Sequence, residues 1–518
     1  MTRRDPSPVG GRLVVLAGGL LLAAALVAGA AWVVSNRSIE RPGTATTPPS
    51  VAAEPVETLP ESTTTSLAET TTTVPLHAAR VGLAHGSTVG LTMFRGNPTR
   101  TFYGTGPVPA EAPEVLWTYP EQPMCGLSTV GGETTQWCGS GWTGQPAVWV
   151  RPDGVTEVVF GAYDKAVHFV NASTGEDTRP PFPTGDIIKG SVTIDPDGYP
   201  LLYTGSRDNK LRIIALDRET PTELWSLDAS AVPGVWNDDW DGNPVVVDDV
   251  LYEGGENGWF FAIRLNRQVD GVVSVDPEIL VEMPGYDDEL LATVGRNVSI
   301  ESSVAYFDGR VYFANSGGRV VGVDVSEAAS GEAPIVFDYW AGDDIDATVV
   351  IDAEGMLYVA VEQERKNERS AEVGQLVKLD PYADGDPRVW GVAVTAEVGD
   401  GGIWATPALH GGHVYVPTHT GRLLAVDADT GEVTWEDEVG PHAWSSAVVV
   451  DGVLMVATCE VPELRAYRLD DPARPEAMWT VTDPADGCIE STPAVWEGRL
   501  YVGSRDGHLR AYGAPGAG

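Results

Sequence analysis

The chain has 518 residues, with 74 Asp and Glu against 33 Lys and Arg, so its formal net charge is −41. An acid excess of this size repels phosphate backbones, which excludes nucleic acid as an expected partner. The length exceeds that of an ordinary single domain unless the architecture repeats. Hydrophobic residues make up 43% of the chain, enough for most of it to bury a core.

The N-terminal residues predict export. Residues 13–34 carry no charge, and as a helix rising about 1.5 Å per residue they suffice to cross a bilayer core of roughly 30 Å. Because Arg3, Arg4 and Arg12 precede this run, we expect residues 1–12 to stay in the cytoplasm. Residues 13–34 then form a transmembrane helix or signal anchor in the cytoplasmic membrane. A cleaved signal peptide stays open as the alternative, and both place the remaining chain outside the cytoplasm.

Residues 35–85 are rich in Thr, Pro, Ser and Glu. Such a composition buries too little apolar surface to fold, and its prolines keep it extended. We therefore expect a disordered linker, with or without O-linked sugar, before a folded part at residues 86–518.

Four cysteines in an exported chain predict two disulfides. The simplest pairing joins Cys125 to Cys138 and Cys459 to Cys488. The chain has no CxxC or Cys/His spacing of the kind that zinc sites use.

One strand pattern recurs from about residue 140 to the end of the chain. Each copy has a short strand, a turn, a strand that usually carries an aromatic residue, a Gly-containing turn and an apolar strand that ends near Asp. The second strands align in eight copies, at Phe160, Tyr203, Tyr252, Tyr312, Tyr358, Tyr415, Met455 and Tyr501. Short strands at this period predict an all-β fold, an eight-bladed β-propeller.

The ends of the repeated region predict how the ring closes. A fourth strand with a tryptophan follows several copies, at Trp225, Trp390, Trp435 and Trp479. The eighth copy has no such strand, because the chain stops soon after Tyr512. Residues 115–119 form an unpaired strand before the first copy, so we expect them to become the outer strand of blade eight.

Two segments carry a family resemblance. Residues 425–435, with the sequence AVDADTGEVTW, resemble the tryptophan-docking repeat of the quinoprotein alcohol-dehydrogenase-like propellers. Residues 93–98, with the sequence MFRGNP, are similar to the usual opening of these proteins. The resemblance covers about residues 93–513 and implies the propeller fold. The family includes pyrroloquinoline quinone (PQQ) dehydrogenases and scaffolds resembling the β-barrel assembly lipoprotein of outer membranes, and fold alone does not choose between them.

The loops that lead into the inner strands converge on one mouth of a propeller. At equivalent positions they offer Lys189, Asp241, Glu301, Asp346 or Ala347, Trp404, Trp444 and Glu490. Loops between second and third strands reach the same rim, and they add Arg207, Asn257, Asn315, His419 and Arg505. Cys138, Cys459 and Cys488 fall on the same set of loops. We therefore expect this disulfide-bearing face to be the working face.

Several rim residues are candidate ligands. Hard cations such as Ca²⁺ bind where several oxygen atoms converge. The rim offers four acids and one amide as candidate Ca²⁺ ligands: Asp241, Glu301, Asn315, Asp346 and Glu490. The alternative is that acidic loop residues only hydrate a very acidic surface. Candidate contacts for a cofactor are Lys189, Trp404, Trp444, Arg207 and Arg505. We expect the charged stretch at residues 362–366 to be a solvated loop.

Two functions follow from these features. The first is a membrane-anchored binding or scaffold module that holds an envelope protein or ligand on the disulfide-bearing face. The alternative is a PQQ- and Ca²⁺-dependent dehydrogenase of alcohols or sugars, with Asp241, Glu301 or Asp346 as the general base. The resemblance implies an adjacent cysteine pair in the dehydrogenases, and this sequence has none. The sequence thus favours binding over catalysis.

Overall fold

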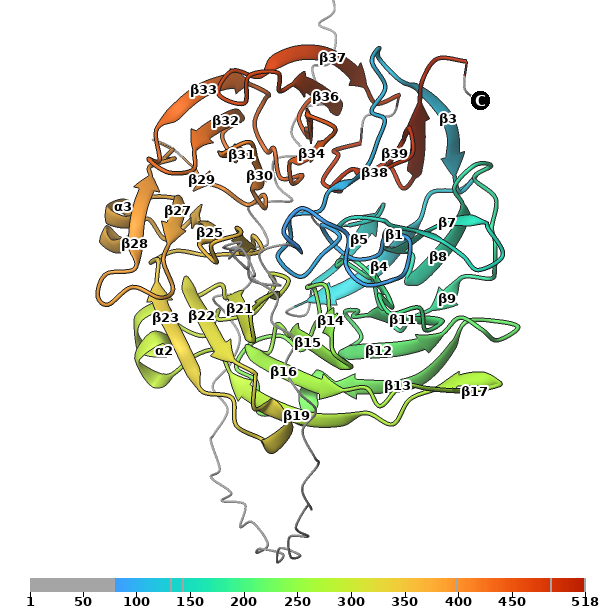
Figure 1. Cartoon of the computed structure of the whole chain (residues 1–518), viewed down its shortest axis with the longest axis horizontal. Helices are drawn as coiled ribbons and strands as arrows, with labels where there is room; N and C mark the ends of the chain where they lie inside the picture. The colour runs from blue at the N-terminus through green and yellow to red at the C-terminus, as the bar shows by residue number, and fades with distance from the viewer. Residues whose placement is uncertain (1–79, 131–132, 142–143, 397–398, 485–486, 517–518) are drawn as a thin grey trace, which may run out of the picture. The chain divides into compact units, whose positions relative to one another are not determined.

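The repeated strand pattern builds eight antiparallel sheets arranged around a ring in the part of the chain that the structure describes (Figure 1). This computed structural model describes residues 80–130, 133–141, 144–396, 399–484 and 487–516. The ring occupies the larger of two units, Pro75–Ser128 with Thr135–Gly518. The expected membrane segment at residues 13–34 and most of the linker lie outside the described residues. Within those residues, no helix is both long and apolar enough to span a membrane.

Blades one to four follow one another along the chain, and each runs from an inner strand to an outer strand. Blade one contains β6 (Ala147–Val150), β7 (Thr156–Ala162), β8 (Ala166–Asn171) and β9 (Phe182–Pro183). Blade two contains β10 (Thr193–Ile194), β11 (Leu201–Thr204), β12 (Lys210–Ala215) and β13 (Thr222–Asp228). Blade three contains β14 (Val245–Val247), β15 (Val250–Gly254), β16 (Trp259–Arg264) and β19 (Glu278–Pro284). Blade four contains β20 (Ala305–Phe307), β21 (Arg310–Ala314), β22 (Arg319–Asp324) and β23 (Ile335–Trp340).

Blades five to eight complete the ring. Blade five contains β24 (Val350–Ile351), β25 (Leu357–Ala360), β27 (Leu376–Leu379) and β28 (Arg388–Val392). Blade six contains β30 (Ala408–His410), β31 (His413–Pro417), β32 (Arg422–Asp427) and β33 (Val433–Glu438). Blade seven contains β34 (Val448–Val450), β35 (Val453–Ala457), β36 (Glu463–Arg468) and β37 (Glu476–Thr482). Blade eight contains β38 (Ala494–Trp496), β39 (Arg499–Gly503), β40 (Leu509–Gly513) and β3 (Glu114–Tyr119).

The core lies between neighbouring blades. The eight aligned residues of the repeat all fall on the second strand of a blade, as predicted, and all are buried. One apolar cluster joins Val159 and Phe169 of blade one to Ile194, Leu202 and Ile214 of blade two. Each sheet therefore buries both of its faces, and the ring is held together by apolar packing from blade to blade.

An N-terminal strand closes the ring, as the sequence predicted. β3 pairs antiparallel with β40, and Trp117 lies opposite Ala511. The indole Nε1 of Trp117 donates a hydrogen bond of 3.2 Å to Ala172 O in blade one. Its ring also packs against Gly175, where a Cβ atom would approach the ring to 2.8 Å. Closure thus joins the two ends of the repeated region, because β3 pairs with the edge of β40 that blade eight would otherwise expose.

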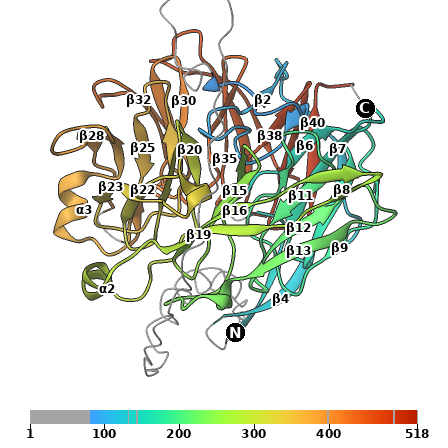
Figure 2. The same ribbon diagram turned by 60° about the horizontal axis from the view of Figure 1, so that its bottom comes forward.

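Residues 88–105, here called the plug, fill the centre of the ring and were not assigned this role from the sequence (Figure 1). The plug forms β1 (Gly90–Leu91), which pairs with β6, and β2 (Gly104–Thr105), which runs parallel to β38 (Figure 2). Its carbonyl groups accept hydrogen bonds from the inner strands of blades two, four and five, at Ile194, Tyr306 and Ile351.

Two fully buried arginines anchor the plug. Arg95 donates to the carbonyl oxygens of Thr406, Pro407 and Ala447, at distances of 3.3, 2.6 and 2.9 Å. Arg100 donates to Val304 O from Nε and Nη2, at 2.9 and 2.6 Å, and to Asn243. Because each guanidinium holds donors in a fixed planar fork, one side chain can bind the carbonyls of neighbouring inner strands at once.

Several short elements lie outside the strands of the eight blades. They are the hairpin β4 (Cys125–Val130) and β5 (Glu133–Cys138), the hairpin β17 (Gln268–Asp270) and β18 (Val272–Ser274), the pair β26 (Glu362–Gln363) and β29 (Gly401–Gly402), the 3₁₀ turns η2 (Ala229–Ala231) and η3 (Ala328–Ser330), and the helices α2 (Asp288–Val294) and α3 (Glu368–Val373). The prediction that residues 362–366 form a solvated loop was wrong for residues 362 and 363, whereas residues 364–366 lie in a loop in which Glu364 and Lys366 are exposed. Glu362 is 2% exposed because β26 pairs with β29 and lies inside the protein.

Candidate functional site

A cavity lies between the plug and the loops that lead into the inner strands. Counted with open solvent, the space between its walls is about 350 Å³, and only a small part of that space is wide enough for a water molecule. The lining residues come from the plug and from blades one to five: Phe94, Gly144, Gly190, Ser191, Asp241, Glu301, Ser303, Asp346 and Thr348. Three carboxylates and one aromatic ring therefore dominate the chemistry of its wall.

The repeat explains why these side chains converge. Lys189, Asp241, Glu301 and Asp346 each stand four residues before an inner strand, which begins at Thr193, Val245, Ala305 and Val350 respectively. Trp404, Trp444 and Glu490 hold the same position before β30, β34 and β38. Since the inner strands surround one axis, equivalent positions on them point to one rim.

Lys189 is the centre of a buried charge cluster, here called the rim cluster, with Asp241, Glu256 and Glu301. Its Nζ atom forms an ion pair with Asp241 and lies 3.4 Å from Glu256 Oε1 and 3.8 Å from Glu301 Oε2. Only 8% of the Lys189 side chain is exposed. One ammonium group therefore serves three carboxyl groups. Glu256 was missed from the sequence, although it directly precedes Asn257, which had been placed on the rim.

Burial and neighbouring charges separate the pKa values of these acids. Burial raises the pKa of Asp241, and Lys189 only partly opposes that rise. Burial also acts to raise the pKa of Glu256, but Lys189 and a hydrogen bond with Asp241 outweigh it and lower the pKa to about 2. The pKa values of these two neighbouring acids are therefore shifted in opposite directions. Burial and the nearby Asp346 raise the pKa of Glu301 to about 8.

Two arginines of the rim are engaged by acids and by one indole ring. Arg207 forms an ion pair with Asp239, and Arg505 Nη1 lies 3.1 Å from Glu490 Oε2. Both guanidinium groups lie over the ring of Trp137, at 5.6 and 4.9 Å from its centroid. Trp137 was not singled out from the sequence, and its only signal was its position directly before Cys138.

The predicted residues Trp404 and Trp444 stack on each other. Their ring centroids lie 4.9 Å apart with an interplanar angle of 11°. The Nε1 atom of Trp444 donates a hydrogen bond of 2.9 Å to His419 Nδ1. Burial, with a smaller contribution from His442, lowers the pKa of His419 to about 4. These rings form a packed aromatic cluster beside the rim, because each tryptophan already uses one face on the other.

Asn315 is placed differently from the other candidate ligands. Its Nδ2 atom donates to Gly285 O at 2.9 Å, and its Oδ1 atom accepts from the backbone of Arg319 at 3.1 Å. Its side-chain amide therefore holds the loop between β21 and β22, and the cavity lining does not include it.

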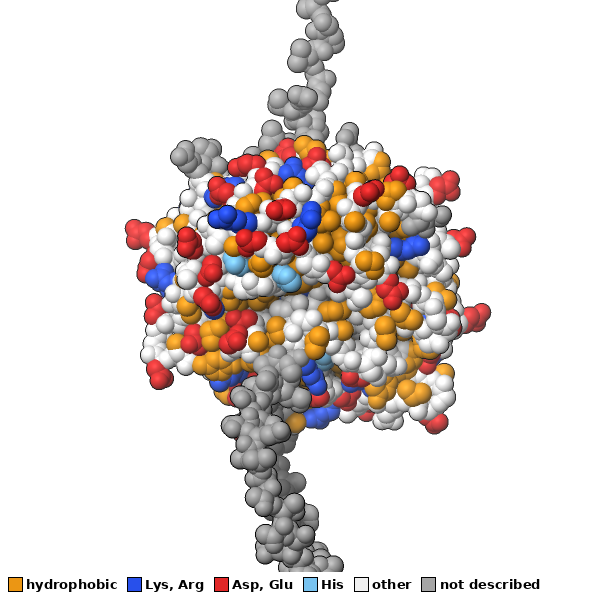
Figure 3. Space-filling model, turned by 45° about the horizontal axis from the view of Figure 1, so that its top comes forward, with side chains coloured by type: hydrophobic (Ala, Val, Ile, Leu, Met, Phe, Trp, Pro, Cys, Tyr) orange, Lys and Arg blue, Asp and Glu red, His pale blue; other side chains and the backbone are white. Residues whose placement is uncertain are grey.

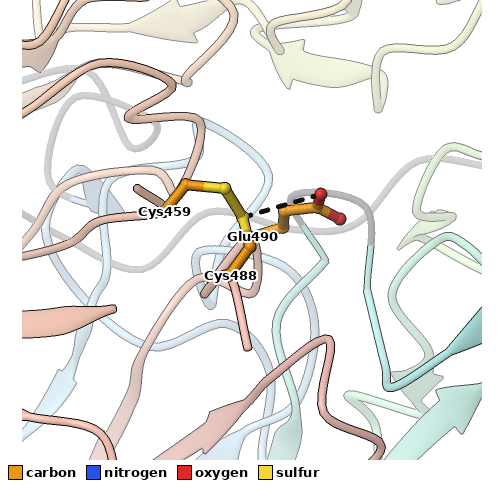
Figure 4. Close-up of side chains that lie close together, drawn as sticks. All are labelled: Cys459, Cys488 and Glu490. Atoms are coloured by element: carbon orange, nitrogen blue, oxygen red, sulfur yellow. Dashed lines mark hydrogen bonds between the residues drawn. A yellow bond between two sulfur atoms is a disulfide. The ribbon is translucent and has the colours of Figure 1, made fainter. Parts of the chain in front are cut away.

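Both predicted disulfides are confirmed. Cys125 bonds to Cys138, and Cys459 bonds to Cys488. Figure 4 shows the second disulfide beside Glu490, whose Oε1 atom lies 3.8 Å from Cys488 Sγ. Because both sulfur atoms are used in the disulfide, this group offers no thiolate to a metal.

The outer surface shown in Figure 3 carries acidic side chains that are scattered rather than gathered, with hydrophobic side chains between them. The buried acids of the rim are a separate population from these surface charges. Asp239, Asp241 and Glu256 are each at most 9% exposed. The alternative that the rim acids only hydrate the surface therefore does not describe these three residues.

Comparison with known proteins identifies the repeat. Residues 372–514, from just before β27 of blade five to the end of blade eight, match the family model described as "Outer membrane protein assembly factor BamB". Residues 372–514 therefore carry repeats of the PQQ-like β-propeller type. The outer membrane protein assembly factor BamB of Yersinia pestis is 35% identical over 114 residues, which cover 21% of this chain and 27% of that protein. The chain thus spans about a quarter of the length of the curated relative that it matches.

Two solved structures are also similar. The crystal structure of the computationally designed Ika8 protein has a TM-score of 0.48 and 12% identity, covering 69% of this chain and 93% of that one. The crystal structure of BamB from Moraxella catarrhalis has a TM-score of 0.38 and 12% identity, covering 78% of this chain and 100% of that one.

The cavity does not fit the quinone that the family resemblance implied. PQQ carries three carboxylates, whereas the cavity wall itself presents Asp241, Glu301 and Asp346. Lys189, the cation beside them, is already paired with Asp241. The carboxylates of the quinone would therefore meet no unpaired cation among the described residues of this wall. We therefore derive no catalytic step through a quinone.

Proposed function

We propose that this chain is a binding or scaffold module that holds an envelope protein outside the cytoplasm, tethered through residues 13–34. The single observation that carries the proposal is the match of residues 372–514 to the model of an outer membrane protein assembly factor. Two disulfides support an oxidising, extracytoplasmic compartment.

The proposed contact surface is the rim that carries both disulfides. The disulfides constrain loops of this rim, and a pre-organised loop loses less entropy on binding. Leu127, on β4 between the two cysteines of the first disulfide, is 60% exposed. An exposed apolar side chain on a constrained hairpin suits a protein partner. The formal charge of −41 favours a partner with a basic surface.

Site-specific photo-crosslinking in cells tests this proposal. A photoreactive amino acid replaces Leu127 on the rim or, as the control, Val389 on the outer strand β28, where the side chain is 49% exposed. We expect one discrete protein adduct from position 127 and none from position 389. Adducts from position 389 with none from position 127 would reject the rim as the docking surface. Dye-linked alcohol or sugar oxidation by the purified chain with added PQQ and Ca²⁺ would reject the non-catalytic role.

A further inference from the structure

A second group of acids lies on blade five, apart from the salt bridges of Lys189. Asp344 and Asp346 stand on the loop that leads into β24, and Glu362 stands on β26. One carboxylate oxygen from each lies within 4.8 Å of the others. We call these three residues the blade-five triad. Asp344 is 6% exposed and Glu362 is 2% exposed, so both carboxyl groups are withdrawn from water.

Among the described residues, the triad has fewer ion pairs than the neighbouring acids. Asp239, Asp241 and Glu256 form an equally tight group, but Lys189 and Arg207 pair with them. In the triad, Arg365 reaches one residue, with Nη2 lying 3.5 Å from Asp344 Oδ2.

Specific oxygen atoms of the triad have no partner. Among the described residues, none donates a hydrogen bond to the buried atoms Asp344 Oδ1, Asp346 Oδ1 or Glu362 Oε1. A buried carboxylate oxygen without a donor is costly, so three such carboxyl groups in one place either hold protons or bind a cation. The unpartnered Oε1 atom of Glu362 is a second observation beside the short distances within the triad, because this atom belongs to a side chain that is only 2% exposed.

The backbone around the triad is held in place without a ligand. Asp343 is fully buried, and its carboxylate accepts hydrogen bonds from the backbone of Asp344, Arg365 and Lys366 at 2.9–3.0 Å. The backbone of Glu362 donates to Asp344 O at 2.8 Å. The two segments that supply the carboxylates are therefore bound to each other, so little reorganisation is needed when an ion binds.

We infer that Asp344, Asp346 and Glu362 together bind one Ca²⁺ ion. All three ligands are carboxylates, with no imidazole or thiolate, which matches hard cations and disfavours Zn²⁺ or Cu²⁺. Ca²⁺ accepts irregular coordination, whereas Mg²⁺ demands a near-ideal octahedron. The site needs no quinone. It shares only Asp346 with the ligand set predicted from the sequence, and Asn315, which holds a loop, is not part of it.

Calcium titration of the full chain tests this site. Metal-free protein is titrated with CaCl₂ by calorimetry, and thermal unfolding is followed with and without CaCl₂ at constant ionic strength. We expect a saturable heat and a saturable rise in Tm, because Ca²⁺ binds the native state. Glu362→Gln keeps the shape of the side chain but removes its charge, and we expect it to weaken Ca²⁺ affinity at least about tenfold.

Glu256→Gln is the matched control, since it removes the same charge from the acid group that Lys189 already neutralises. Glu256→Gln should retain the Ca²⁺-dependent heat and rise in Tm. The rise in Tm is taken for each variant against the same variant without CaCl₂, so a difference in basal stability does not affect it. Asp346→Asn, at a partly exposed position, replaces Glu362→Gln if the latter does not fold. An equal Ca²⁺ response in wild type and Glu362→Gln, a response to MgCl₂ alone, or no saturable response would overturn the inference.

Discussion

Replacing Lys189 with Met tests whether the rim cluster is held by one ammonium group. The substitution keeps most of the buried aliphatic stem and removes the charge that lies 3.4 Å from Glu256 and 3.8 Å from Glu301. In an effective dielectric of about 20, the gross attraction of a unit pair at 3.4 Å is about 5 kcal/mol. Desolvation offsets part of it, and removing one partner of a buried ion pair costs about 3–5 kcal/mol. We therefore expect the free energy of unfolding to fall by about 3–5 kcal/mol.

Equilibrium urea unfolding of the full chain measures this loss as a lower midpoint at unchanged slope. Lys165→Met is the matched control, because Lys165 pairs with Asp186 at 3.3 Å while both side chains are partly exposed, at 32% and 21%. We expect that control to lose at most about 1 kcal/mol. A loss below about 1 kcal/mol for Lys189→Met would refute the reasoning, because the carboxylates would then not depend on the ammonium group.

The same variant predicts a change with pH. In the wild type, the pKa of Glu256 is lowered from 4.5 to about 2. A lowered carboxyl pKa contributes stability that is complete above the unfolded pKa and is lost as pH falls from 4.5 through about 2. Without Lys189, the largest influence that lowers this pKa is lost, and only the smaller effects of Asp241, Arg207 and Asn237 still oppose burial, so this contribution shrinks. The difference in stability between wild type and Lys189→Met should therefore shrink as pH falls below 4.5, and a constant difference would contradict this assignment.

Three further predictions concern the plug, the blade contacts and the aromatic cluster. Arg95→Met should lower stability by at least about 3 kcal/mol in urea unfolding, because three buried carbonyl groups lose their donor; a loss below about 1 kcal/mol would contradict the anchoring role. Trp390→Ala should cost about 3–5 kcal/mol in thermal unfolding, since Trp390 is 9% exposed and packs on Gly431, whereas Val389→Ala on the exposed face should cost little. The lowered pKa of His419 disfavours protonation of the folded state, so the wild type should lose stability as pH falls from 6.5 to about 4. His419→Gln should reduce this loss. An equal change in the free energy of unfolding with pH in both proteins would contradict this prediction.

The fold follows from patterns that are local in the sequence. Tyr203, Tyr415 and the other aligned residues mark second strands because strand alternation and turn residues act over a few positions. The closing strand at residues 115–119 was predictable by counting, since one blade lacked an outer strand. The disulfides were predictable because export, an even number of cysteines and their spacing left one simple pairing.

The candidate site was only partly predictable. Equivalent positions in the repeat placed Lys189, Asp241 and Glu301 on one rim, and the structure brings them within ion-pair distance. Glu256 and Trp137 were missed, because a second-to-third-strand loop and an inserted hairpin contribute them rather than the aligned position. Asn315 had the right chemistry for a ligand, but hydrogen bonds inside its own loop use its side chain.

The eight-bladed ring, its closure and its disulfides could be predicted from the sequence, because each depends on strand periodicity, turn chemistry or cysteine spacing. What fills the ring and which charges are buried became visible only in the folded protein. Arg95 and Arg100 are fully buried, although arginine is usually exposed, because the plug gives their donors carbonyl groups from different blades. Glu362 lies in a charged stretch typical of a surface loop, yet it is buried because β26 pairs with β29. Such burial depends on contacts between distant segments, which local sequence patterns do not encode.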